Sequence, residues 1–87
     1  MSSTVSDNPV TESVALCAWA EDGRVYIELH DERVLSFPAH KFSRLSSATP
    51  DQLASVRVRA EGSALRWDEI DEDISVEGIL RGIFELD

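Results

Sequence analysis

Apolar and polar residues alternate with a period of two along residues 24–30, where Val25, Ile27 and Leu29 occupy every second position. This period predicts a β-strand with one buried face and one face in water. A polar turn follows, and residues 33–37 predict the next antiparallel strand.

Residues 13–19 are apolar at nearly every position, which predicts a buried strand with Cys17 in the core. Asp22-Gly23 lies between this run and the alternating strand. The dipeptide is typical of a tight hairpin turn, because glycine readily takes a positive φ. The three strands are therefore expected to form an antiparallel meander.

Short helical structure is predicted after the meander. Phe42 and Leu45 are spaced i, i+3 within residues 39–47 and would point inward. Residues 49–52, Thr-Pro-Asp-Gln, predict the start of a short helix. Threonine is a favoured N-cap, proline suits the first helical position and glutamine completes a capping box.

Residues 56–59 alternate valine with arginine and predict a fourth strand, and Leu65 with Trp67 predicts a fifth. Residues 61–63, Glu-Gly-Ser, would join these strands as a hairpin with a turn of about two or three residues. Trp67 is expected to be a core anchor on the last strand.

The C-terminal segment predicts a helix that packs on the sheet. Ser75 is a favourable N-cap, and an apolar stripe follows at helical spacing: Val76, Ile79, Leu80 and Ile83. The expected fold is α+β with the order β-β-β-α-β-β-α: a three-stranded antiparallel meander, a short helix, a β-hairpin and the C-terminal helix. Residues 1–11 are expected to be a flexible tail, and residues 12–87 a single domain.

Charge changes this picture of an ordinary small domain. Seventeen acidic residues face eight basic ones, for a net charge of −9 at pH 7. Such a surface repels phosphate backbones and anionic membranes, so we expect neither direct nucleic-acid binding nor membrane binding. The excess acid either keeps the protein soluble or attracts a basic partner. The lone cysteine, the lack of a secretory signal and the lack of a long apolar run predict a cytoplasmic protein.

Five carboxylates are concentrated just before the C-terminal helix: Asp68, Glu69, Asp71, Glu72 and Asp73. The segment lacks the glycine and the later glutamate of a calcium-binding loop, and nothing predicts the buried acid of a paired-carboxylate hydrolase. We interpret it as a solvated loop that adds charge near a helix N-terminus. A contact surface for a basic partner is the functional alternative, and a cation site is the third.

Arg57, Arg59 and Arg66 are expected on one face of the sheet, as a basic stripe within an acidic protein. They would pair across strands with Glu28 or with the acidic segment, or else bind a small anion or an acidic peptide.

Few residues could support catalysis. His30 and His40 are the only imidazole bases, and His30 falls on the wet face of its strand. One cysteine and two scattered histidines do not supply a structural zinc site, and the four glycines are too scattered for a phosphate loop. We therefore expect no enzyme activity, no cofactor and no metal.

Two stretches carry a family resemblance: residues 48–53, Ala-Thr-Pro-Asp-Gln-Leu, and residues 70–76, Ile-Asp-Glu-Asp-Ile-Ser-Val. With Trp67 between them, they are similar to the bacterial domain of unknown function 2442 family. The resemblance extends over nearly everything after residue 12. The chain departs from the family pattern at Arg66, where histidine is usual, and at Asp68, where proline is common.

The resemblance implies an α+β domain with no established activity, often encoded beside another small protein in an arrangement like a toxin–antitoxin pair. Our leading hypothesis is a non-catalytic protein-interaction module, antitoxin-like, that neutralises a small basic partner encoded by a neighbouring gene. One alternative is an acidic nucleic-acid mimic that inhibits a DNA-binding protein. Another is a small enzyme or ligand-binding domain with a surface site of histidine and carboxylate. A homodimer is also compatible with the sequence.

Overall fold

The computed structural model describes residues 14–82, which form two three-stranded antiparallel sheets and several short helices. The predicted tail, residues 1–11, and Ile83 of the predicted stripe lie outside these residues. The elements are β2 (Ala15–Glu21), β3 (Arg24–Leu29), β4 (Val34–Pro38), η1 (Ala39–Lys41), α2 (Ser43–Ser46), α3 (Pro50–Ala54), β5 (Arg57–Arg59), η2 (Ala60–Gly62), β6 (Ala64–Trp67), β7 (Glu72–Ser75) and α4 (Val76–Leu80).

The first sheet has the order β2-β3-β4 and confirms the predicted meander. Val25, Ile27 and Leu29 of β3 are fully buried, as their alternation predicts. Asp22 and Gly23 both have positive φ, 52° and 78°, which is the geometry of the tight turn expected from this dipeptide.

The interpretation of β2 as a buried strand is wrong. Ala15 is buried, but Leu16 and Cys17 are exposed, so Cys17 is not a core residue. The register shifts between Ala15 and Cys17, where Leu16 forms an irregularity in the strand. Only one face of this sheet packs on the core, and an antiparallel strand can leave its other face in water.

The second sheet has the order β5-β6-β7, and its third strand is an addition to the predicted hairpin. Residues 60–63 join β5 to β6, a longer connection than the expected turn. Trp67 is fully buried, as predicted, and its indole Nε1 donates a hydrogen bond to the carbonyl of Leu53 on α3 over 3.1 Å. This bond joins the second sheet to the helical end of the molecule.

Local capping explains where the helices begin. The Thr49 side chain accepts from the backbone N–H of Gln52, and the Gln52 side chain accepts from the backbone N–H of Thr49, so the predicted capping box is confirmed. Ser75 caps α4 by accepting from the N–H of Gly78. Phe42 and Leu45 are buried, as their spacing predicts.

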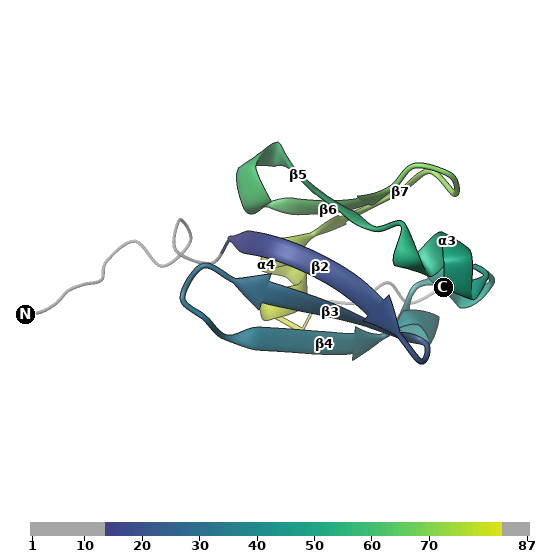
Figure 1. The fold of residues 1–87 in the computed structure, drawn as a ribbon, viewed down its shortest axis with the longest axis horizontal. Coiled ribbons are helices and arrows are strands. Elements are labelled where there is room, and N and C mark those ends of the chain that lie inside the picture. The colour runs from purple at the N-terminus through teal and green to yellow at the C-terminus, as the bar shows by residue number, and fades with distance from the viewer. Residues whose placement is uncertain (1–13, 83–87) are drawn as a thin grey trace, which may run out of the picture.

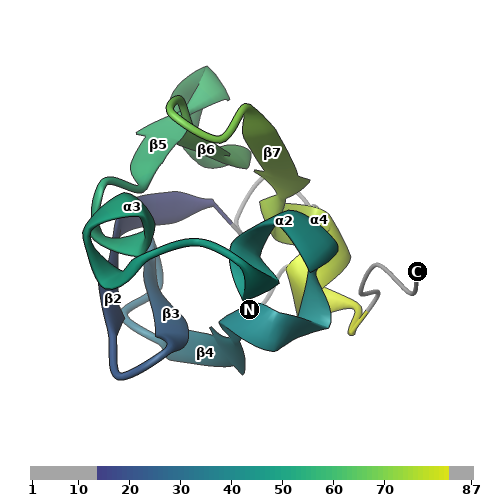
Figure 2. The same ribbon diagram turned by 90° about the vertical axis from the view of Figure 1, so that its right-hand side faces the viewer.

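The two sheets face each other across the core (Figure 1). Viewed along the long axis, β2 lies beside β5 on one side, and α4 lies between the sheets on the opposite side (Figure 2). Helices α2 and α3 lie together at one end. The α+β fold, with its meander and its C-terminal helix, is thus confirmed. None of the helices within residues 14–82 is long and apolar enough to cross a membrane.

Candidate functional site

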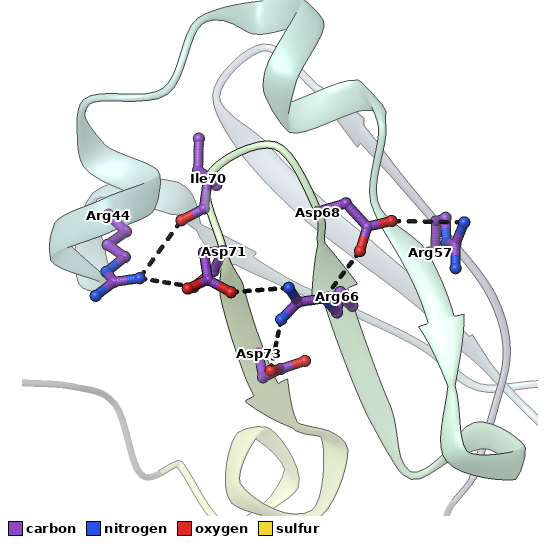
Figure 3. A network of polar contacts seen from close by, with 7 residues as sticks. All are labelled: Arg44, Arg57, Arg66, Asp68, Ile70, Asp71 and Asp73. Atoms are coloured by element: carbon purple, nitrogen blue, oxygen red, sulfur yellow. Dashed lines mark hydrogen bonds and ion pairs between the residues drawn. The ribbon is translucent and has the colours of Figure 1, made fainter.

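The acidic segment forms the connection between β6 and β7. Asp71 adopts a left-handed conformation with φ 54°, and its backbone N–H donates to the carbonyl of Asp68 over 3.2 Å. This tight turn carries Asp68 and Asp71 to the side of Arg66, and Asp73 meets Arg66 across the β6–β7 ladder (Figure 3).

The Arg66 guanidinium binds three aspartates at once. Its Nε donates to Oδ1 of Asp68 (2.9 Å), its Nη2 to Oδ1 of Asp71 (2.8 Å) and its Nη1 to Oδ2 of Asp73 (2.7 Å). A guanidinium has five N–H donors in one plane, which allows it to bind several carboxylates at once. Here each of its three nitrogens donates to a different aspartate. We call these four residues the Arg66 network.

Two further arginines, one on β5 and one on α2, also contact the turn between β6 and β7. Arg57 of β5 lies opposite Arg66 in the sheet and contacts Asp68 Oδ2 at 3.5 Å. Arg44 of α2 donates to the backbone carbonyl of Asp71 over 2.6 Å and approaches the carbonyl of Ile70 at 3.5 Å. The turn is therefore fixed to its own sheet and to a helix.

Arg66 changes the ionisation of two of the aspartates that it binds, Asp68 and Asp71. The hydrogen bond from Arg66 lowers the pKa of Asp68, and the positive charge of Arg57 lowers it further. The pKa of Asp71 is lowered by its hydrogen bond from Arg66 and by the charge of that guanidinium. The hydrogen bonds to Asp71 and Asp68 in turn raise the pKa of Arg66. Asp68, Asp71 and Arg66 are therefore charged at neutral pH.

Replacing Arg66 with glutamine is expected to raise the pKa of Asp68 and Asp71 toward their ordinary value of 3.8. In the native protein both pKa values are depressed in the folded state. The stabilisation that they contribute is therefore complete above pH 3.8 and is lost as the pH falls through the folded values. Carboxyl NMR titrations would measure both pKa values, and denaturation on either side of that pH would measure the stability.

Arg81→Gln, which breaks an exposed pair with Glu77, is the control and should leave both pKa values in place. Unchanged values in Arg66→Gln would contradict the assignment.

The structure brings most of the predicted site residues together. Arg57, Arg59 and Arg66 share one face of the second sheet, as predicted from their alternation and as the β5–β6 register places them. Arg66 pairs with the acidic segment, whereas Glu28 lies on the first sheet and accepts a hydrogen bond from Cys17 instead. Glu72 is half-buried at the start of β7, and Glu69 is exposed at the tip of the turn.

Internal pairing limits what the acidic segment can do chemically. Asp68, Asp71 and Asp73 direct carboxylate oxygens at a guanidinium, and a cation bound there would have to displace or repel that charge. Within residues 14–82, no group of three or more histidine, cysteine, aspartate or glutamate side chains is arranged to hold a metal ion. The same pairing reduces the free negative charge that a nucleic-acid mimic would present at this turn.

Sequence reasoning missed a second surface, the outer face of the first sheet. Trp19 of β2 stacks on Tyr26 of β3 with 5.5 Å between ring centroids and 5° between ring planes. Large apolar side chains are exposed there or at its edge: Leu16 (55%), Trp19 (37%) and Val34 (54%). The Asp22-Gly23 turn contained the signal, because Trp19 and Tyr26 are equally distant from it and must be cross-strand partners.

Comparison with known proteins identifies the family of this fold. The family model described as "Protein of unknown function (DUF2442)" matches residues 18–85. The chain belongs to the DUF2442 family. No protein with a curated description matches it.

Two solved structures resemble this DUF2442 chain. A crystal structure of a protein of unknown function from Rhodospirillum rubrum is 31% identical, has a TM-score of 0.81, and aligns over 87% of this chain and 94% of the other. A solution NMR structure of an uncharacterised protein from Chromobacterium violaceum is 23% identical, has a TM-score of 0.76, and aligns over 88% and 72%. The second similarity concerns the fold alone.

Arg66 and Asp68, where the sequence is expected to differ from the family pattern that it resembles, are hydrogen-bonded to each other (Figure 3). This hydrogen bond helps to hold the turn between β6 and β7.

An open hollow of about 430 Å³ lies where the β2–β3 turn approaches η1 and α3, and both His40 and Asp22 line it. His30, at the end of β3, is exposed, and its backbone N–H bonds the carbonyl of Val14. Of the two histidines considered as bases, His40 is therefore the one that lines this hollow, and Asp22 is a carboxylate in the same lining.

Proposed function

We propose that this DUF2442 protein is a non-catalytic protein-interaction module that binds a small basic protein, and that it acts like an antitoxin toward a partner encoded by a neighbouring gene. The observation that carries the proposal is unpaired negative charge. Six exposed carboxylates make no hydrogen bond or ion pair within residues 14–82: Glu21, Asp22, Glu32, Asp51, Glu61 and Glu69.

Several of the basic residues are already paired with other carboxylates of the chain. Arg33 pairs with Asp31, Arg66 binds its three aspartates, and Arg81 pairs with Glu77. With a net charge of −9, the molecule attracts a basic protein over a distance and repels a second copy of itself. Long-range attraction of this kind accelerates association and makes it sensitive to salt.

The state of the single cysteine supports a role without covalent catalysis. Partial desolvation raises the pKa of Cys17, and its hydrogen bond to Glu28 and the charge of that carboxylate raise it further. Because the thiolate is the nucleophile, a thiol with a raised pKa reacts slowly at neutral pH.

Coexpression with the product of the neighbouring gene tests the proposal. The two proteins should copurify at low salt, and the affinity measured by calorimetry should fall by about tenfold or more at high salt. Expression of the neighbour alone should slow growth, and coexpression of this chain should restore it. The absence of a complex at low salt would overturn the proposed partner, and a complex without growth rescue would overturn the antitoxin role.

A further inference from the structure

The outer face of the first sheet combines apolar surface with unpaired charge. Strand alternation places Cys17, Trp19 and Glu21 of β2 on this face, opposite Glu28, Tyr26 and Arg24 of β3, respectively. Val34 and Ser36 of β4 complete it. Single exposed apolar residues are common on protein surfaces, but a contiguous group of large ones marks an interaction site.

The aromatic pair is already ordered for binding. Trp19 and Tyr26 lie nearly parallel, and Trp19 still exposes 37% of its surface. Stacked rings lose little conformational freedom when a partner covers them, so less entropy opposes the association. Indole is also the best aromatic surface for a guanidinium or an ammonium group.

Charges around the rings select the sign of the partner. Glu21 is exposed and makes no ion pair or hydrogen bond with any residue of the range 14–82. Its cross-strand neighbour Arg24 donates instead to the Ser36 hydroxyl on the same face over 3.0 Å. Among the described residues, Glu28 accepts a hydrogen bond only from the weak thiol donor of Cys17, at 3.6 Å. A cation placed over Trp19 would thus lie on a face whose carboxylates have no strong partner. A second copy of this chain would bring the same negative charges and would be repelled.

We propose that the outer face of the first sheet is the docking surface, and that it takes a basic protein segment with an arginine side chain over Trp19 and between the carboxylates of Glu21 and Glu28. This inference rests on the proposed function and places its contact surface. It moves that surface away from the acidic turn, because Asp68, Asp71 and Asp73 already bind Arg66.

Polyarginine and polylysine peptides of equal length are suitable probes, with binding mapped by amide and indole NMR signals at low salt. Polyarginine should shift the Trp19 indole signal and the signals of Tyr26 and Cys17, and it should bind more tightly than polylysine because guanidinium stacks on aromatic rings. The buried Trp67 indole is an internal reference that should not move. Shifts confined to residues 68–73 would overturn this docking surface while leaving a basic partner in place.

Three variants sharpen the test. Trp19→Ala should weaken polyarginine binding by about twofold to tenfold, as the loss of a cation–π contact predicts. Glu21→Gln should weaken it more than Glu69→Gln, because both remove one exposed, unpaired carboxylate but only Glu21 lies on the outer face. Equal effects of the two glutamate variants would overturn the placement. So would sedimentation that shows a dimer of the native chain and a monomer of Trp19→Ala, since the occupant would then be a second copy.

The native cysteine gives an independent readout with the neighbouring gene product. Cys17 lies on the outer face and is the only cysteine of the chain, so maleimide labelling reports on this surface alone. Labelling should slow in the complex relative to the free protein. A salt-sensitive complex in which Cys17 labels at the free rate would overturn the docking surface and support the proposed function, whereas the absence of any complex would overturn both.

Discussion

Replacing Trp67 with alanine is expected to lower the free energy of unfolding by about 3–5 kcal/mol. The side chain is fully buried between the sheets, and its removal leaves a cavity as well as a lost hydrogen bond to the Leu53 carbonyl. A domain of this size is stabilised by about 4–13 kcal/mol in total, so this one change would remove a large part of it. Urea denaturation followed by circular dichroism would measure the loss.

The two tryptophans of this chain provide a matched control. Trp19→Ala removes the same side chain from a partly exposed position, where its stacking on Tyr26 and part of its apolar burial are lost, and it should cost clearly less than Trp67→Ala. If Trp67→Ala does not fold, Trp67→Phe still tests the indole bond, because it leaves the Leu53 carbonyl without its donor. Comparable losses for Trp19→Ala and Trp67→Ala would contradict the role of Trp67 as the core anchor.

Replacing Gly62 with alanine is expected to be the second most damaging change and to lower the free energy of unfolding by about 2–4 kcal/mol. The loss has two causes, an unfavourable φ and a steric clash. Gly62 has φ +93°, and a Cβ built there would lie 2.8 Å from the Ala15 carbonyl oxygen and 2.8 Å from the Cβ of Val14. The Ala15 oxygen belongs to the backbone of β2, so relief of the clash requires the strand itself to shift.

Gly23→Ala separates the two causes. Gly23 also has a positive φ, +78°, but a Cβ there would meet nothing within 4 Å. Replacing Gly23 with alanine should therefore lower the free energy of unfolding only by the energy of holding alanine in a left-handed conformation, about 1–2 kcal/mol. Thermal denaturation of both variants would give the difference, which measures the close approach of η2 to β2. Equal losses would show that β2 yields to the added methyl group.

Much of the local structure could be predicted from short-range patterns. The alternation of β3, the Asp22-Gly23 turn and the capping box of α3 all appear in the structure as expected. Each depends on residues within a few positions of one another, where backbone preference and side-chain capping act without the rest of the fold.

The strand β7 shows where such patterns fail. Residues 68–73 carry five carboxylates, and Asp and Glu are depleted in strands, so the sequence favours a loop here, yet β7 begins at Glu72. Leu65 and Ile74 are cross-strand partners in the core, and Arg66 neutralises Asp73 on the other face of the ladder. These contacts with β6 stabilise the strand, and they depend on residues several positions away in the sequence.

Only part of the candidate site could be predicted from the sequence, because the rest depends on contacts that the fold creates. Arg57, Arg59 and Arg66 could be placed on one face, and pairing of Arg66 with the acidic segment could be expected, but the convergence of three aspartates on one guanidinium depends on the turn at Asp71. Its consequence is that Asp68, Asp71 and Asp73, in the most acidic stretch of the chain, already have a partner within the chain.

The sequence by itself determined the α+β class, the family, the hairpin turn and the helix caps, because strand periodicity and capping are local. Only the tertiary structure decided which faces of the strands are covered. The apolar run of β2 predicted a buried strand, yet only one face of its sheet packs on the core, so Cys17 and Trp19 are exposed. Burial depends on which layers pack together, and a run of apolar residues does not specify how many layers there are.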